Sequence, residues 1–151
     1  MGSEESHLKL AKLLLKKAKS DLESGRVLQL NGLHANAVFM AQQCAEKAAK
    51  AVLAMQGLDI REHIVSGYFA SEVLSFPPEH WEEKLRDAFR SLVFLEEHTI
   101  KPRYPMVTPA RIWDPEAGYD AAAGEDAVKK AEKILLTLKA YINETLKGSQ
   151  T

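Results

Sequence analysis

The sequence has a single cysteine, Cys44, so no disulfide can form within the chain. A lone thiol suits a reducing compartment, and we expect a cytoplasmic protein. No apolar run approaches the roughly 20 residues that a membrane-spanning helix needs, so no membrane association is expected. The first six residues are polar and acidic, which is unlike a secretory signal. Cys44 lies among alanines, which favours a buried small side chain over a nucleophile.

The sequence also lacks a strong charge of either sign and the common catalytic motifs. Its 20 Lys and Arg nearly cancel its 21 Asp and Glu, which argues against a duplex-DNA-binding protein but leaves room for a local basic patch. A Gly-rich phosphate loop, zinc-ligand spacing and a Ser-His-Asp arrangement are all missing. A di-iron bundle needs Glu-x-x-His on two helices, and only Glu4 with His7 fits. We therefore expect no metal and no cofactor.

What is present is helical periodicity. Apolar residues recur at spacings of three and four over residues 4–24, where Ser24-Gly25 is a natural stop, and again over 33–56, ending at Gly57. The second segment carries two stripes of mostly small side chains, which predicts the central helix of a bundle. Further helices are expected over 63–74, after Pro77-Pro78, and over 121–146 with Asp120 as the cap.

Taken together, these segments predict an all-α protein with no strand. The expected architecture is an up-and-down bundle of four long helices plus one short helix, forming a single domain over residues 1–151. A long Pro-rich loop precedes the last helix, because residues 98–120 hold four of the six prolines. Connections of this length are usually functional or disordered, and the aromatic residues of this loop argue against plain disorder.

A polar stripe follows one side of the predicted central helix. Its members are spaced so that they share a face: Asn36, Gln43, Glu46, Lys47 and Lys50. One interpretation is a solvated face with an internal Glu46–Lys50 pair at i, i+4. The other is a groove or partner contact, because a central helix has little surface left for water.

The loop contains a second group that could carry function, Arg103-Tyr104, followed by Arg111 and Trp113. A guanidinium binds phosphate in a fork and a neighbouring ring offers a stacking face for a base. Alternatively, Tyr104 and Trp113 only pin the loop to the bundle, while Arg103 caps a helix end or pairs with Glu96 or Glu97. Composition alone leaves both interpretations open.

Three pieces of the sequence together resemble the HEPN family (higher eukaryotes and prokaryotes nucleotide-binding). Residues 37–53 contain Gln43-x-x-Glu46-Lys47-x-x-Lys50, similar to the second helix of that family. His63 lies where members carry a Thr-His or similar pair at the start of the third helix. Arg103-Tyr104-Pro105 is similar to the Arg-Tyr-Pro that follows the fourth helix in one branch of the family. The resemblance extends from about residue 5 to residue 147.

This resemblance implies a helical bundle, frequent homodimerisation and a small nucleotidyltransferase as partner, as in toxin–antitoxin pairs. It also implies a nucleotide or RNA ligand, held in a polar groove by Gln43, Glu46, Lys50, His63, Arg103 and Tyr104. Some members are metal-independent ribonucleases that use Arg-x(4–6)-His. Here seven residues separate Arg26 from His34 and Arg90 from His98, and no histidine follows Arg103. Without that histidine no obvious group moves the ribose 2′-hydroxyl proton, so no catalytic residue is assigned.

Three functions therefore stay open. The first is a non-catalytic nucleotide- or RNA-binding module or adaptor. The second is a toxin-like ribonuclease, in which Arg103 would contact the scissile phosphate while His98 or His63 replaces the missing histidine. The third is a purely structural homodimeric bundle whose polar stripe is only an interface.

Overall fold

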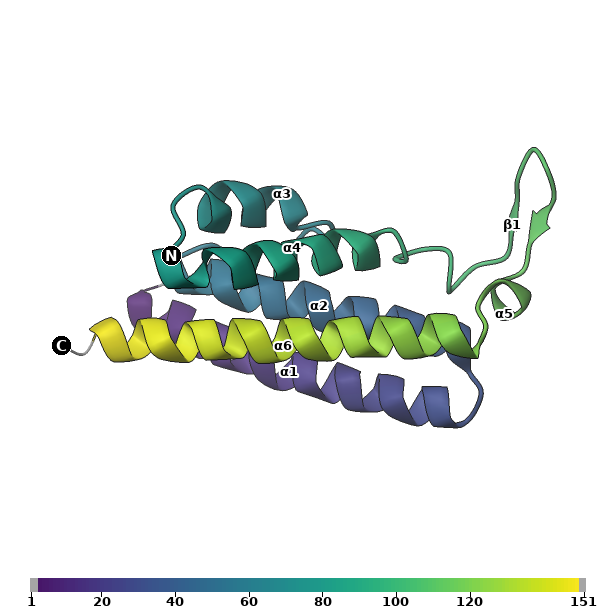
Figure 1. The fold of residues 1–151 in the computed structure, drawn as a ribbon, viewed down its shortest axis with the longest axis horizontal. Coiled ribbons are helices and arrows are strands. Elements are labelled where there is room, and N and C mark those ends of the chain that lie inside the picture. Colours follow the sequence, from purple (N-terminus) through teal and green to yellow (C-terminus); the bar gives the residue numbers. More distant parts are fainter. Residues whose placement is uncertain (1–2, 150–151) are drawn as a thin grey trace.

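The structure is a computed structural model that describes residues 3–149, so the first two residues of the polar N-terminal stretch lie outside it. Four long helices form the body: α1 (Glu4–Leu30), α2 (His34–Met55), α4 (Glu82–Glu96) and α6 (Ala121–Ser149). The start of α1 and the end of α6 lie at one end of the bundle, and the segment between α4 and α6 projects from the other (Figure 1). The predicted all-α bundle is confirmed.

Helix α2 is the centre of the bundle, as its two stripes of small residues predicted. Every alanine of this helix, together with Cys44, lies in the core. It packs against α1, α4 and α6. Cys44 is completely buried, with its sulfur 3.9 Å from the carbonyl oxygen of Ala131 on α6. The interpretation of Cys44 as a small core side chain is thereby confirmed.

The predicted end of the first helix at Ser24-Gly25 is wrong. Helix α1 continues to Leu30, and the chain turns at Gly32, where φ is 75°. A Cβ on Gly25 would lie 3.4 Å from the Cβ of Met40 and 3.5 Å from the carbonyl oxygen of Ala37. These are ordinary van der Waals distances, so Gly25 is a buried residue inside α1 that faces α2, and it does not end the helix.

The short third helix differs from the prediction over 63–74. Helix α3 (Ser66–Phe69) continues directly into a π-helical turn, η1 (Ala70–Leu74), so His63 precedes the helix by three residues. The buried carboxylate of Glu96, at the end of α4, accepts hydrogen bonds from the backbone N–H groups of Val65 and Ser66 at 2.8 and 2.9 Å. These bonds cap the N-terminus of α3. Glu96 is therefore not the partner of Arg103.

The helix after Pro77-Pro78 is confirmed, beginning as the short η2 (Glu79–Trp81) and continuing as α4. The loop over 98–120 is ordered, and it corrects the expectation of no strand. Two short strands, β1 (Met106–Val107) and β2 (Ile112–Trp113), pair antiparallel, and a single turn, α5 (Pro115–Gly118), follows them. Asp120 caps α6 as predicted, accepting from the Ala123 N–H at 2.8 Å.

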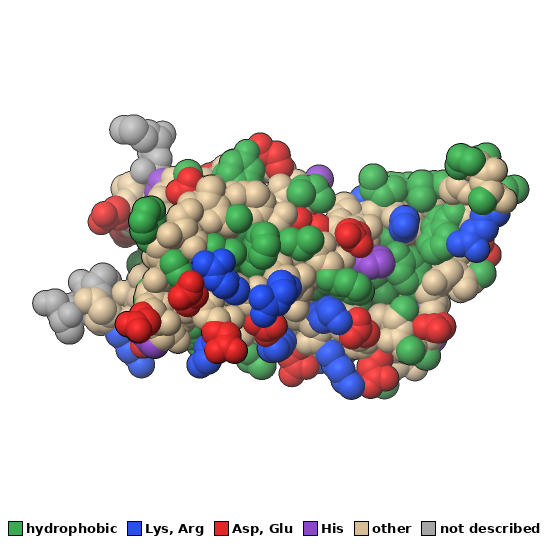
Figure 2. Space-filling model, turned by 45° about the horizontal axis from the view of Figure 1, so that its top comes forward, with side chains coloured by type: hydrophobic (Ala, Val, Ile, Leu, Met, Phe, Trp, Pro, Cys, Tyr) green, Lys and Arg blue, Asp and Glu red, His purple; other side chains and the backbone are tan. Residues whose placement is uncertain are grey.

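Trp113 joins the start and the end of this loop and packs against the hydrophobic core of the bundle. The indole N–H of Trp113 donates to the Lys101 carbonyl at 2.8 Å, and the Trp113 ring lies so close to Gly118 that a Cβ there would overlap it. Pro102 is fully buried. Hydrophobic side chains, with Lys and Arg among them, gather over this end of the molecule (Figure 2). None of the helices in residues 3–149 is long and apolar enough to cross a membrane.

Candidate functional site

The polar stripe of α2 forms a connected network of hydrogen bonds and ion pairs. Lys50 donates to a carboxylate oxygen of Glu46 at 3.1 Å, and Gln42 donates to the other at 3.1 Å. Gln43 donates to Gln42 at 2.8 Å and accepts from Lys47 at 3.0 Å. The Glu46–Lys50 pair predicted from the i, i+4 spacing is confirmed.

A buried carboxylate of α1 completes the network. Asp21 is 2% exposed and lies 2.7 Å from the Lys47 ammonium and 3.3 Å from that of Lys17. Glu46 is only 3% exposed. A buried carboxylate is stable only when it is paired, so Lys47 and Lys50 serve first to neutralise Asp21 and Glu46. We call these six residues the α2 polar network: Asp21, Gln42, Gln43, Glu46, Lys47 and Lys50.

His63 lies at the edge of this network. Its Nδ1 is 3.4 Å from the Glu46 carboxylate, while 70% of its side chain is exposed. The structure therefore brings Gln43, Glu46, Lys50 and His63 together, as the family resemblance implied. Glu46 is buried and already bonded, so among these residues only His63 presents most of its side chain to solvent.

Arg103 and Tyr104 form a second group, on the loop. The Arg103 guanidinium carbon lies 4.6 Å from the centre of the Phe39 ring on α2 and 5.2 Å from that of Tyr104. Its Nε donates to the Thr99 carbonyl at 2.9 Å, which fixes the side chain over the turn after α4. Tyr104 remains 53% exposed. The Tyr104 ring is thus available for stacking and does not pin the loop, which is the role of Trp113.

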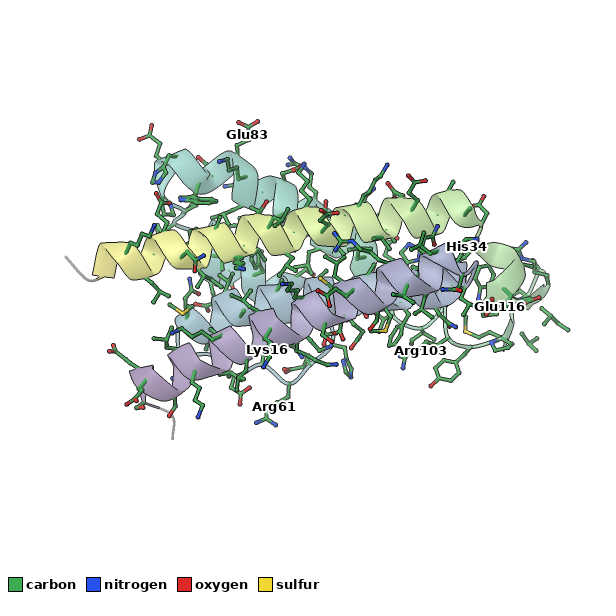
Figure 3. The ribbon with its side chains drawn as sticks, turned by 90° about the horizontal axis from the view of Figure 1, so that it is seen from below. Lys16, His34, Arg61, Glu83, Arg103 and Glu116 are labelled. Carbon is green, nitrogen blue, oxygen red and sulfur yellow. The ribbon has the colours of Figure 1, made fainter. Side chains whose placement is uncertain are left out.

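Both groups lie on one side of α2. Phe39 and Glu46 are seven residues apart, which returns to nearly the same helical face about 10 Å further along the axis. Arg103, which stacks on Phe39, therefore sits on the side of α2 that carries Glu46, about two turns away. In Figure 3, Arg103 lies near the end of the bundle that carries the loop, and Arg61 lies nearer to the opposite end.

The arginines divide into two classes by partner. The four on the rest of the chain each pair with a carboxylate: Arg26 with Glu132, Arg61 with Asp59, Arg86 with Glu82, and Arg90 with Asp87. Arg103 and Arg111 instead lie over aromatic rings, and within residues 3–149 neither forms an ion pair. Their positive charge is therefore available to an anion from outside.

His98, one candidate for a displaced catalytic histidine, is tied to Tyr119. Its Nδ1 lies 2.7 Å from the Tyr119 hydroxyl, and its ring packs between Phe94 and Tyr119. Burial lowers the pKa of His98 and raises the pKa of Tyr119 to about 12. The lowered pKa favours the neutral imidazole, and its tautomer sets which of the two groups donates this bond. Burial also raises the pKa of Cys44 to about 12, so this thiol is unreactive.

In neither of the spaced Arg–His pairs does the arginine contact the histidine in the described residues. Arg26 pairs with Glu132, while His34 contacts Gln29. Arg90 bonds to Asp87, and His98 lies eight residues further, roughly 12 Å at the rise of a helix. His63 is next to Glu46, about two turns of α2 from the position of Arg103. Across residues 3–149 no three His, Cys, Asp or Glu side chains come together in a way that could hold a metal ion.

Sequence reasoning missed three residues of this region. Asp21 could have been recognised, because it follows Ala18 by three positions and so borders the predicted apolar stripe. Phe39 is the aromatic ring on which Arg103 stacks. The sequence gives no indication of this contact apart from the position of Phe39 one helical turn before Gln43. The bond between His98 and Tyr119 joins residues 21 apart, so only the folded loop brings them together.

Comparison with known proteins agrees with this arrangement. A family model for the HEPN domain matches residues 11–141. The protein named "Putative toxin MJ1304" from Methanocaldococcus jannaschii is 37% identical over 139 residues, which are 91% of each chain.

Two solved structures share the fold. The archaeal HEPN homologue ST0689 has a TM-score of 0.66 and 30% identity, covering 87% of this chain and 97% of its own. TT1696 from Thermus thermophilus has a TM-score of 0.65 and 27% identity, covering 86% and 96%. The central α2 with its Gln-x-x-Glu-Lys-x-x-Lys network, the loop carrying Arg103-Tyr104-Pro105, and these matches lead to one conclusion: the chain belongs to the HEPN family.

Proposed function

We propose that this protein is a non-catalytic binding module for a nucleotide unit, either free or within single-stranded RNA. The observation that carries the proposal is the placement of Arg103. Its guanidinium lies over the rings of Phe39 and Tyr104, and no carboxylate of the described residues pairs with it. A guanidinium of this kind suits phosphate, and the exposed Tyr104 ring suits a base.

The α2 polar network plays a different part in this proposal. Lys50 and Glu46 bond to each other, so in this proposal they hold the part of α2 beside His63 rigid rather than bind phosphate. Gln43, one turn from Phe39, and the exposed His63 are the members that contact polar groups of the ligand. The ligand would thus lie along α2 between Arg103 and His63.

The test is a thermal-shift titration with ATP, GTP, CTP and UTP, run beside fluorescence anisotropy with a labelled single-stranded RNA. A ligand at 100 times its Kd raises the unfolding free energy by about 2.7 kcal/mol. We expect binding that Arg103→Ala removes and Arg103→Lys weakens, since Lys lacks the planar fork. The two arms separate free nucleotide from RNA.

Arg86→Ala is the matched control, because Arg86 is also an exposed arginine but pairs with Glu82. It should bind like the wild type. If Arg103→Ala binds as tightly as Arg86→Ala, or if neither nucleotides nor RNA bind the wild type, the proposal is wrong. Tyr104→Ala should weaken binding by about 1–3 kcal/mol, the contribution of one stacked base.

A second candidate is a toxin-like, metal-independent ribonuclease, favoured by the name of the archaeal relative. It predicts RNA fragments with 2′,3′-cyclic phosphate ends in the presence of a chelator. Against it stand the bond between His98 and Tyr119 and the distance of His63 from Arg103 along α2. If the wild type cleaves RNA and His98→Ala or His63→Ala does not, the ribonuclease is the correct function and the first proposal is wrong.

Family membership also leads us to propose a homodimer and a small nucleotidyltransferase partner. Sedimentation of the purified chain tests the first, and co-purification with a co-expressed nucleotidyltransferase tests the second. A purely structural bundle is the remaining alternative. It predicts that Lys50→Glu or Gln43→Leu changes the oligomer while no ligand binds, and a monomer would count against it.

A further inference from the structure

A groove runs along the bundle between α1 and α6, away from Arg103 and its loop. The two helices lie side by side and antiparallel in both ribbon views (Figures 1 and 3). The groove has a volume of about 550 Å³ and extends from Lys12 and Asn143 to Arg26 and Glu132. Fourteen residues of α1 separate its ends, which corresponds to about 21 Å at 1.5 Å per residue.

The floor of this groove is aliphatic. It is lined by Leu15, Leu22, Leu135 and Leu136, of which Leu136 is 60% exposed. Among the described residues, no aromatic side chain lines the groove. Single-stranded nucleic acid is held by aromatic platforms as well as charge, so a floor of leucines favours an apolar protein surface over RNA.

The rim of the groove is strongly positive in a protein whose formal net charge is −1. It carries five cations, Lys12, Lys16, Lys19, Arg26 and Lys139, and one carboxylate, Glu132, so its net charge is 5 − 1 = +4. Only Arg26 is neutralised, by Glu132 at 2.9 Å. Across residues 3–149 none of the four lysines forms an ion pair.

This row of lysines concentrates positive charge along the groove without acidic partners in the described part of the chain. The exposed lysines of the first half of α6 pair with acids: Lys129 with Glu125, Lys130 with Asp126, and Lys133 with Asp87. Lys12, Lys16 and Lys19 follow one another at spacings of four and three on one face of α1, where like charges repel. A partner with negative charge would remove this repulsion.

We infer that the groove between α1 and α6 is a docking site for an acidic amphipathic helix of a partner protein. The leucines of the groove would contact the apolar face of that helix, and the lysines would contact Asp or Glu on its flanks. A second copy of this chain fits less well through a two-fold contact, which would bring the same lysines together. The inference is independent of nucleotide binding, because Arg103 lies beside α2.

The probe for the test is a fluorescein-labelled helical peptide of about 14 residues, long enough to span the groove, with Leu along one face and Glu on its flanks. Its controls are a scrambled peptide and one with Lys in place of Glu. Binding to the full chain is measured by fluorescence anisotropy at low and high salt. We expect saturable binding of the Leu/Glu peptide alone, weakening as salt rises.

Two matched pairs of variants locate the site. Lys16→Glu should weaken binding by about tenfold or more, while Lys9→Glu, on the same helix outside the groove, should leave it unchanged. Leu136→Ser should weaken binding, while Leu13→Ser should not. Leu13 is 54% exposed, close to Leu136 in exposure, and lies outside the groove.

Several results would overturn the inference. One is no binding of the Leu/Glu peptide by the wild type up to about 1 mM, the weak end of measurable affinity. Another is equal binding of the scrambled peptide or equal effects within either pair of variants. If Lys16→Glu abolishes RNA binding instead, the groove is a nucleic-acid surface. If Leu136→Ser changes only the oligomer mass, the groove is a contact between copies.

Discussion

The lysines of α2 and the arginines of the loop over 98–120 differ in what surrounds their positive charge. Lys47 and Lys50 are mostly buried and lie within 3.1 Å of the carboxylates of Asp21 and Glu46. Arg103 and Arg111 are exposed and lie over the rings of Phe39, Tyr104 and Trp113. An aromatic ring orients a guanidinium and leaves its charge in place, whereas a carboxylate neutralises it.

This difference separates residues that hold the fold from residues that meet a ligand. In the α2 polar network, every charge has a partner, and removing one partner leaves a buried ion uncompensated. On the loop, no described carboxylate competes with an incoming phosphate for Arg103. Substitutions in the first region should therefore change stability, and substitutions in the second should change binding.

The largest loss of stability is expected for Lys47→Ala. It leaves Asp21 buried with only the more exposed Lys17, and we expect a decrease in the free energy of unfolding of about 3 kcal/mol. Urea denaturation followed by circular dichroism measures this loss. Lys129→Ala, which breaks an exposed pair with Glu125, is the control and should leave stability unchanged. Equal effects would show that the α2 polar network is solvated rather than buried.

Trp113→Ala should come next, because Trp113 holds the loop through its bond to Lys101 and its packing on Gly118. We expect a loss of about 2 kcal/mol, less than for a fully buried tryptophan, since Trp113 is only partly buried. Limited proteolysis should then cut within 98–120 in the variant before the wild type. Unchanged cleavage would mean that Pro102 and the Tyr119 contact suffice to hold the loop.

A smaller effect is expected from His98 and Tyr119. Tyr119→Phe removes the hydroxyl bonded to His98, which should cost about 1 kcal/mol. Burial lowers the pKa of His98 in the folded protein, so as pH falls below about 6.5 the unfolded chain takes up the proton first and stability decreases. Stability curves from pH 8 to 5 should therefore fall less steeply in His98→Gln. An unchanged slope would assign the pH dependence to other histidines.

The smallest change in stability is expected for Arg103→Ala, although the same substitution should have the largest effect on nucleotide or RNA binding. An exposed cation–π contact contributes about 0.5–1 kcal/mol, so the free energy of unfolding should fall by no more than that. If Arg103→Ala lowers the free energy of unfolding as much as Lys47→Ala does, the role of Arg103 is structural rather than ligand binding.

The helical periods of the sequence were sufficient for the all-α fold class and for the central helix. The small residues of α2 repeat at three and four, which predicted a central helix, and Gly57 ended it as expected, with φ of 86°. The error at Gly25 is instructive, because a buried glycine inside a helix has the same local signal as one that ends a helix. The partner that distinguishes them, Met40 on α2, is known only from the tertiary structure.

For the candidate site, the sequence by itself determined which residues have the right chemistry and which of them share a face of α2. Helical spacing fixed the Glu46–Lys50 pair, because residues four apart are neighbours on any helix. Only the tertiary structure decided that Asp21 neutralises Lys47 and that Arg103 stacks on Phe39. These contacts join residues 26 and 64 positions apart, where no local period acts and the packing of α1, α2 and the loop sets the distances.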